Sequence, residues 1–352
     1  MAFNERHSRF WRMCFSKLKT VHAVFYAKNQ DLQMTDSYQM FPSVVTAVEQ
    51  LTPLIKRFTF KRQDGENFPA FTGGSHIIVK MNDKLSNAYS LMSNANDLST
   101  YQVCVRKDVE GKGGSVFMHD HCVQDFKLEI SSPKNLFELA QTGEKHILIA
   151  GGIGITPFLP QMDELATRGA HYELHYAFRS PEHAALLDDL KQSIHAEHVY
   201  SYVDSEGSHL DLNALIGQQD KGTHVYVCGP KPMIDAVINT CNQHRYRDEY
   251  IHWEQFASSA PENAESFTVV LAKSNQRIEV MADQTILQAI ESLNIDVECL
   301  CREGVCGTCE TAILQGEAEH FDQYLDDDEK ASQQSMMICV SRAKGKEITL
   351  DL

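Results

Sequence analysis

Four cysteines near the C-terminal end constrain the fold of this chain more than any other feature of its sequence. They follow the pattern C-x4-C-x2-C with a distant fourth member, and they are Cys301, Cys306, Cys309 and Cys339. This spacing is typical of a plant-type [2Fe-2S] cluster, which is held by four thiolates. Gly304 and Gly307 lie in the same loop and allow the backbone to curl around an inorganic core. The spacing therefore predicts that these four cysteines are metal ligands.

Two other interpretations of the cysteines are weaker. A structural zinc site usually contains two C-x2-C pairs, whereas this stretch contains one, at Cys306 and Cys309. Cys299 breaks the cluster spacing, so we take it as a non-ligand. The isolated cysteines are expected to be reduced, packed thiols; they are Cys14, Cys104, Cys122 and Cys241.

Length, composition and charge limit the class of protein. The 352 residues suggest two or three domains, and a content of 43% hydrophobic and 23% charged residues is typical of a folded globular chain. The net charge of −16 argues against nucleic acid as the main partner, because phosphate binding depends on clustered Lys and Arg. An acidic surface is better suited to a basic patch on another protein.

The first 33 residues are basic and carry scattered aromatic side chains, without the apolar stretch of a secretory signal. Two interpretations stay open: a leader before a start at Met34, or a short amphipathic contact with a membrane or a partner. No run approaches the roughly 18 apolar residues of a membrane-spanning helix. We therefore expect a cytoplasmic protein without a transmembrane segment.

Three regions differ in their periodicity. Short apolar runs broken by turn residues predict an antiparallel barrel, with strands at 44–48, 56–60, 76–81, 88–91, 102–106 and 127–131. Strands that alternate with helices then predict a parallel, doubly wound sheet, with strands at 146–150, 173–178, 199–202 and 224–228 and a helix at 158–168. After a polar linker, a hairpin at 267–271 and 277–280, a helix from 286 and the cysteine loop predict a compact β-grasp module.

A glycine-rich turn after the strand at 146–150 is suited to a dinucleotide, because glycines admit a pyrophosphate and a helix N-terminus offers free amides. The candidate residues there are Gly151, Gly152, Gly154, Thr156 and Pro157. A second motif follows a later strand of the same sheet and is expected to close the crevice; it consists of Cys228, Gly229 and Pro230. Arg179 would lie near the adenosine ribose, so the choice between NADH and NADPH stays open.

Two short motifs of the barrel are suited to a flavin. The strand end contains Asn87, Ala88, Tyr89 and Ser90, and the turn before a helix contains Gly113, Gly114 and Ser115. Tyr89 can lie against the flavin ring and Ser90 can donate a hydrogen bond near its N5, while the glycine turn can hold a phosphate. Neither motif is specific without its neighbours.

Taken together, these residues resemble the ferredoxin-reductase superfamily, and within it the phthalate dioxygenase reductase and vanillate demethylase reductase family. Longer stretches resemble most closely the branch that serves carnitine monooxygenases; they are residues 71–76, 87–91, 151–158, 298–310 and 341–346. The resemblance implies FMN and NADH as cofactors, and it places Phe256 where an aromatic residue covers the flavin. Relatives commonly have an arginine at the position of Asn87, which puts the affinity for FMN in doubt.

The resemblance implies a multidomain α+β and α/β fold: an antiparallel flavin-binding β-barrel, a doubly wound nicotinamide-binding domain and a C-terminal β-grasp plant-type ferredoxin. The expected parts are an N-terminal extension at 1–37, the FMN-binding barrel at 38–142, the NAD-binding domain at 143–257, a linker at 258–265 and the [2Fe-2S] ferredoxin domain at 266–352.

The expected activity is that of an oxygenase reductase. Hydride would pass from the nicotinamide to the flavin between Ser90 and Cys228, and single electrons would then pass through the cluster to a Rieske-type oxygenase subunit that converts carnitine to trimethylamine and malic semialdehyde. An aromatic-ring dioxygenase or a vanillate-type demethylase is the alternative partner, and a redox module without rapid NADH oxidation is the alternative class. The acidic residues Asp322, Asp326, Asp327, Asp328 and Glu329 either steer docking or form a solvated face.

Overall fold

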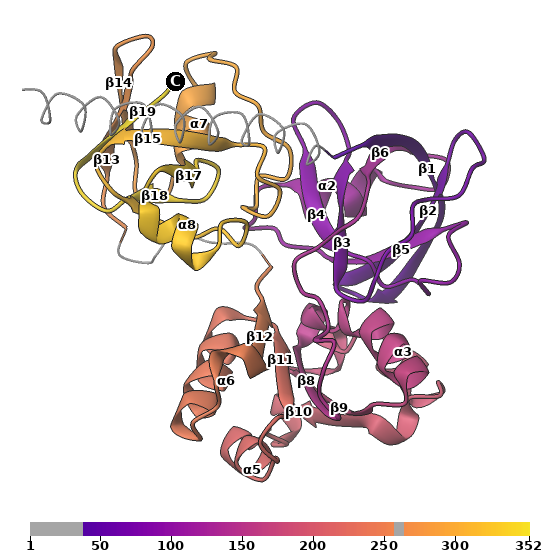
Figure 1. The fold of residues 1–352 in the computed structure, drawn as a ribbon. Coiled ribbons are helices and arrows are strands. Elements are labelled where there is room, and N and C mark those ends of the chain that lie inside the picture. The colour runs from indigo at the N-terminus through magenta and orange to yellow at the C-terminus, as the bar shows by residue number, and fades with distance from the viewer. Residues whose placement is uncertain (1–37, 257–263) are drawn as a thin grey trace, which may run out of the picture. The chain divides into compact units, whose positions relative to one another are not determined.

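The computed structural model describes residues 38–256 and 264–352. The predicted N-terminal extension and most of the predicted linker therefore lie outside the described residues. The described chain forms three main sheets in the order in which the sequence predicts them, an antiparallel barrel, a parallel sheet and a small mixed sheet (Figure 1). The predicted fold class is thereby confirmed.

The first sheet has the strand order β4-β3-β6-β1-β2-β5, and β7 pairs with β3. Its strands are β1 Met40–Thr52, β2 Ile55–Arg62, β3 Ser75–Lys80, β4 Ser86–Ser90, β5 Tyr101–Arg106, β6 Lys127–Ser131 and β7 Lys134–Asn135. All pairs are antiparallel. The Met92 amide donates to the Gln102 carbonyl at 3.0 Å, which joins the end of β4 to the start of β5 and curls the sheet into a barrel.

Buried side chains of alternate strand positions fill the barrel. Phe58, Phe60, Ile77 and Ile130 are fully buried, as the period of two along a half-buried strand requires. The Phe68 ring stacks on Tyr101 with centroids 4.1 Å apart. Helix α2, Gly114–His121, follows β5 and places its first residues near β4.

The second sheet is parallel, with the strand order β10-β9-β8-β11-β12. Its elements are β8 Lys145–Gly151, α3 Phe158–Arg168, β9 His171–Phe178, α4 Leu187–Lys191, β10 Val199–Val203, α5 Leu212–Gly217, β11 His224–Cys228, α6 Lys231–Gln243 and β12 Ile251–Glu254. The strand order reverses between β8 and β11, so the carboxyl ends of these two strands flank the crevice where such sheets bind ligands. Strand β12 was not predicted from the sequence.

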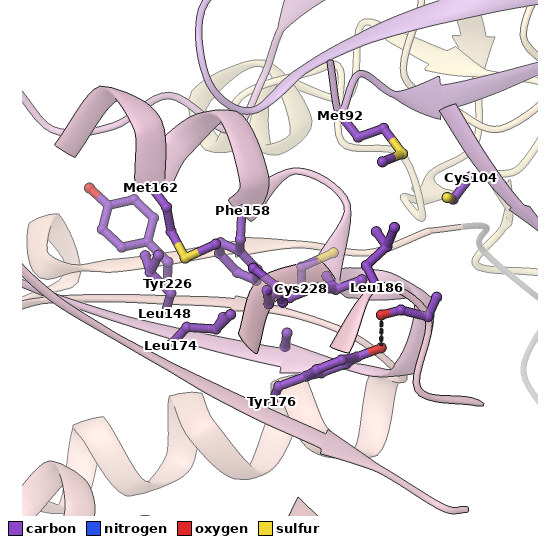
Figure 2. Packing of buried hydrophobic residues seen from close by; sticks show 14 of the residues in the cluster. Met92, Cys104, Leu148, Phe158, Met162, Leu174, Tyr176, Leu186, Tyr226 and Cys228 are labelled. Atoms are coloured by element: carbon purple, nitrogen blue, oxygen red, sulfur yellow. Dashed lines mark hydrogen bonds between the residues drawn. The ribbon is translucent and has the colours of Figure 1, made fainter. Parts of the chain in front are cut away.

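The barrel and the parallel sheet contribute to one apolar core. Met92 and Cys104 of the barrel belong to the same buried cluster as Leu148, Phe158 and Leu174, and Figure 2 shows these residues with Cys228 at the end of β11. The Tyr176 hydroxyl in this cluster donates to the Ala185 carbonyl at 3.1 Å, which satisfies its buried polar atom (Figure 2).

The third sheet has the order β14-β13-β19-β15-β17. The elements of this region are β13 Phe267–Leu271, β14 Gln276–Val280, α7 Ile286–Glu291, β15 Glu310–Gln315, β16 Ala318–Glu319, α8 Asp327–Ser332, β17 Ser335–Met337, β18 Arg342–Ala343 and β19 Glu347–Leu350. Strands β13 and β14 form the predicted hairpin, and β13 pairs in parallel with β19. A capping box between Thr285 and Gln288 starts α7. Among the described helices, none has the length and apolar character needed to cross a membrane.

Candidate functional site

The four predicted cysteine ligands come together in the interior of the third module. Their exposed fractions are 0% for Cys301, 5% for Cys306, 2% for Cys309 and 1% for Cys339. A hydrogen bond with the Cys301 side chain lowers the pKa of the Cys306 thiol. The sulfurs of Cys299 and Cys339 both neighbour that of Cys309 and raise the pKa of the Cys309 thiol.

The backbone of the cysteine loop is curled by residues with positive φ. Arg302, Gly304 and Gly307 have φ values of 60°, 76° and 79°. A Cβ at Gly304 would lie 2.6 Å from a Val340 methyl carbon, and one at Gly307 would lie 2.3 Å from the Tyr324 ring. Glycine is therefore required at both positions, as the sequence predicts.

The donor set of the loop fits a two-iron cluster. The amides of Cys301 and Glu303 point at sulfurs, at 3.4 Å from Cys306 Sγ and 3.4 Å from Cys301 Sγ. Such N–H groups stabilise negative charge on cluster ligands. Within the described ranges, no three His, Cys, Asp or Glu side chains converge on a single-ion position.

The two predicted nicotinamide motifs lie against each other at the carboxyl ends of β8 and β11. A Cβ at Gly154 would lie 2.3 Å from the Cys228 carbonyl oxygen, and one at Gly229 would lie 3.0 Å from the Gly151 Cα. A 3₁₀ turn, Gly152–Ile155, separates β8 from α3, and α3 begins at Phe158, as the sequence predicts. The structure thus brings the two motifs together at one edge of the parallel sheet.

The other predicted residues of this region lie at the turns and strand ends beside the two motifs. Thr156 donates from its hydroxyl to the Ile153 carbonyl at 3.2 Å and so shapes the turn. Pro157 and Pro230 precede α3 and α6. Arg179 directly follows β9, as predicted.

Glu254 is a site residue that sequence reasoning missed. It ends β12, is 8% exposed, and its Oε2 lies 3.9 Å from Cys228 Sγ. Burial raises the pKa of Glu254 to about 8, against the opposing effects of Cys228 and the nearby Ser90 hydroxyl. The carboxyl end of a strand beside β11 is where a functional side chain is expected in such sheets, so prediction of β12 would have identified it.

Two polar atoms of β4 are buried without a partner. Ser90 Oγ and Tyr89 Oη have no hydrogen-bond partner of ordinary geometry among the described residues, and burial raises the pKa of Tyr89 well above its usual value. Buried polar groups normally have partners. A flavin on this strand would supply them, so the two side chains fit the predicted cofactor.

The turn that precedes α2 fits a phosphate. Gly113 has a φ of 90° and caps the helix, whose first amides have no intrahelical acceptor. A Cβ at Gly114 would lie 1.7 Å from Asn87 Oδ1, so this glycine brings the helix start against β4. The Ser115 hydroxyl accepts from the Asp108 amide at 3.0 Å and holds the turn closed.

Asn87 and Ala88 bind a residue of the cysteine loop. Asn87 Nδ2 donates to Glu303 Oε1 at 2.6 Å, and the Ala88 amide donates to Glu303 Oε2 at 2.8 Å. Glu303 was not among the predicted site residues. No local signal identifies it, because its partners lie more than two hundred residues away in the sequence, at separations of 216 and 215.

The predicted aromatic residue Phe256 and the predicted acidic run differ in their exposure. Phe256 is 38% exposed and follows β12 by two residues. The acidic run does not form one solvated face: Asp322 is 4% exposed and accepts from the Leu325 amide, and Asp326 caps α8. Asp326 and the acidic residues of α8 are exposed and remain available to a partner or to water.

Comparison with known proteins gives two family matches and close relatives. The 2Fe-2S iron-sulfur cluster binding domain matches residues 269–344, and the N-terminal domain described as dimethylamine monooxygenase subunit DmmA-like matches residues 131–251. A carnitine monooxygenase reductase subunit of Acinetobacter baumannii is 81% identical over 91% of this chain and 100% of the relative. That of Escherichia coli is 50% identical over 90% and 99%.

The fold is also found in a solved structure. Phthalate dioxygenase reductase, described as a modular structure for electron transfer from pyridine nucleotides to [2Fe-2S], is 31% identical, with a TM-score of 0.72 over 91% of this chain and 99% of the other.

Proposed function

Because this chain belongs to the family of oxygenase reductase subunits that includes the carnitine monooxygenase and phthalate dioxygenase reductases, we propose that it supplies electrons from NADH to a carnitine monooxygenase. The reductase uses a [2Fe-2S] cluster, FMN and a nicotinamide. When bound, these groups convert a two-electron donor into single electrons for the oxygenase. One observation carries the proposal: strand β4 bears the unpartnered Ser90 and Tyr89 and is also bonded to the cysteine loop.

The cysteine loop holds the cluster. Cys301, Cys306, Cys309 and Cys339 are its ligands in this proposal, and the loop amides offset the negative charge of their sulfurs. The barrel would hold the flavin: Tyr89 would contact its ring, Ser90 would donate a hydrogen bond to it, and Gly113, Gly114 and Ser115 would receive the phosphate with Asn87 and Ala88 beside them. Phe256 covers the ring from the end of the parallel sheet.

The crevice at the ends of β8 and β11 holds the nicotinamide. Gly151, Gly152 and Gly154 admit the pyrophosphate, and Thr156 and Pro157 shape the turn before α3. Cys228, Gly229 and Pro230 close the opposite side. Ser90, Cys228 and Glu254 then orient the nicotinamide and exclude water, so the residues act by position.

We infer domain boundaries at 38–142, 143–257 and 266–352, with an extension at 1–37 and a linker at 258–265. The three sheets support this division. A cytoplasmic location is part of this proposal, and it fits the nine described cysteines, which form no disulfide with one another.

The finer identity of the oxygenase is part of the proposal. We infer a Rieske-type partner that acts on carnitine, which the identity of 81% to a carnitine monooxygenase reductase subunit supports. NADH is the expected donor, and steady-state rates with NADH and NADPH compare the two.

The decisive experiment reconstitutes the purified reductase with its candidate oxygenase. Flavin and iron–sulfur absorption should bleach together on addition of NADH. Trimethylamine should then form from carnitine, while vanillate and phthalate should not be consumed. Turnover of an aromatic substrate instead of carnitine would replace the proposed partner with an aromatic-ring dioxygenase or a demethylase, and a partner with a haem spectrum would exclude the Rieske type.

A further inference from the structure

The cysteine loop makes several hydrogen bonds to the barrel within four residues. Ser86 Oγ donates to the Leu300 carbonyl, and Lys112 Nζ donates to the Arg302 carbonyl at 2.7 Å. The Arg302 guanidinium meanwhile donates to Glu291 of α7 at 3.0 Å. Arg302 therefore ties the loop to its own module through the side chain and to the barrel through the backbone.

Glu303 makes the most directional of these contacts. Each of its carboxylate oxygens accepts one hydrogen bond, from Asn87 Nδ2 at 2.6 Å and from the Ala88 amide at 2.8 Å. Strand β4 is at the edge of its sheet, where it pairs only with β3 among the described strands. An edge strand exposes unpaired amides, and the Glu303 carboxyl group provides an acceptor for one of them.

Gln323 makes an equivalent contact on the parallel-sheet side. Its Nε2 donates to the Gln255 carbonyl at 2.6 Å, and its Oε1 accepts from the Gln255 amide at 3.2 Å. The Gln323 amide donates to the Gly304 carbonyl at 3.0 Å. One residue thus connects the cysteine loop to the backbone next to Glu254, the buried carboxyl group beside Cys228.

Building on the proposed function, we propose that Glu303 and Gln323 are positioning residues that hold the cluster loop in register with the flavin site. Glu303 attaches the loop to strand β4, which is proposed to hold the flavin, and Gln323 attaches the loop to the segment that follows β12. Both side chains act through protein groups, since Glu303 bonds Asn87 and Ala88 and Gln323 bonds Gln255. Because electron transfer slows steeply as the separation of donor and acceptor grows, loss of either contact should slow the step between flavin and cluster and spare the step between nicotinamide and flavin.

The test compares two variants of the full-length holoprotein with matched controls. Glu303→Gln places an amide nitrogen against one of the two donors, and Gln323→Ala removes both bonds to Gln255. Glu279→Gln and Gln276→Ala change the same residue types at exposed positions of β14. In stopped-flow experiments with NADH, each test variant should pass electrons from flavin to cluster about tenfold more slowly, since small misplacements have large rate effects. Flavin reduction, cluster absorption and both controls should match the wild type.

Hydrogen–deuterium exchange provides a readout that does not depend on turnover. Glu303→Gln should accelerate exchange of the Ala88 amide, and Gln323→Ala should accelerate exchange of the Gln255 amide. A substitution that merely destabilised the module would instead accelerate exchange throughout β13 to β19.

Wild-type rates of flavin-to-cluster transfer in both variants would overturn the inference. If the Glu303→Gln variant loses its flavin, the rate in Gln323→Ala tests the inference alone, because Gln255, the partner of Gln323, lies outside strand β4. Failure of NADH to reduce the flavin of the wild type would instead refute the proposed function, and the exchange rates would still show whether the two contacts form.

Discussion

Cys228 Sγ lies 3.9 Å from Glu254 Oε2, where the neighbouring parallel strands β11 and β12 end together. A thiol and a carboxyl group are thereby buried at the mouth of the crevice where the glycine turn ends. Burial raises the pKa of both groups. Burial at this position therefore favours the neutral form of both groups.

The Glu254→Gln variant should become more stable relative to the wild type as pH rises. The pKa of Glu254 is raised from 4.5 to about 8 on folding, so its favourable contribution is complete below about pH 4.5 and is lost as pH rises through about 8. Glutamine stays uncharged at every pH. In urea unfolding of the apoprotein, the free energy of unfolding of the variant should increase relative to that of the wild type between about pH 5 and about pH 9. A difference between the two proteins that does not change with pH would contradict ionisation of a buried Glu254.

Gly154→Ala should weaken the binding of NADH. The added Cβ would lie 2.3 Å from the Cys228 carbonyl oxygen, and backbone cannot move aside cheaply, so the glycine turn must separate from the Cys228 motif. We expect KM for NADH to rise by about tenfold or more, with ground-state binding lost. Gly345→Ala is the control, since a Cβ there meets nothing within 4 Å, and an unchanged KM in Gly154→Ala would contradict the close packing.

Cys299 and Cys309 should respond differently to substitution by serine. Cys309 is 2% exposed and belongs to the predicted ligand set, so Cys309→Ser should lose the iron–sulfur absorption and most of the bound iron. Cys299 lies beside it but outside the ligand spacing, so Cys299→Ser should retain both. Iron content and the visible spectrum of the purified variants measure this, and loss of the cluster in Cys299→Ser would show that the adjacent sulfur is a ligand.

Three stacked histidines should make the parallel sheet sensitive to acid. His224 Nδ1 lies 3.0 Å from His252 Nε2, and the His146 ring stacks on His224 with centroids 5.5 Å apart. Burial, followed by the neighbouring histidines, lowers the pKa of His146 and of His252 to about 4. The contribution of these histidines to the stability of the fold is complete above the unfolded pKa of about 6.5 and is lost as pH falls toward about 4. The reason is that, as pH falls, the unfolded chain binds protons at a higher pH than the folded chain does.

Substitution of one histidine tests this prediction. His252→Phe keeps an aromatic ring but cannot be protonated, so the decrease of its urea midpoint between about pH 7 and about pH 5 should be smaller than that of the wild type. His209→Phe is the control, because His209 is largely exposed. An equal change of the urea midpoint with pH in His252→Phe and in the wild type would contradict the prediction.

Local sequence patterns were sufficient to predict a helix or strand where its apolar residues are periodic and turn residues mark both of its ends. Helix α3 and strand β11 begin and end where the apolar pattern predicts them. Strand β12 was missed because it is short, lies at the sheet edge and exposes Trp253. Its last residue, Glu254, was therefore missed as well.

The sequence by itself determined the ligand spacing of the cysteine loop and the glycines that its curled backbone requires, because these features depend on residues close together in the chain. It also determined the order of the three sheets, since a change from strands alone to alternating strands and helices, and then a polar linker, separates the regions. Only the tertiary structure decided which polar groups meet between sheets, such as Glu303 with Ala88 and Gln323 with Gln255, at separations of 215 and 68 residues. Such pairs depend on how folded surfaces pack, and no local propensity specifies that.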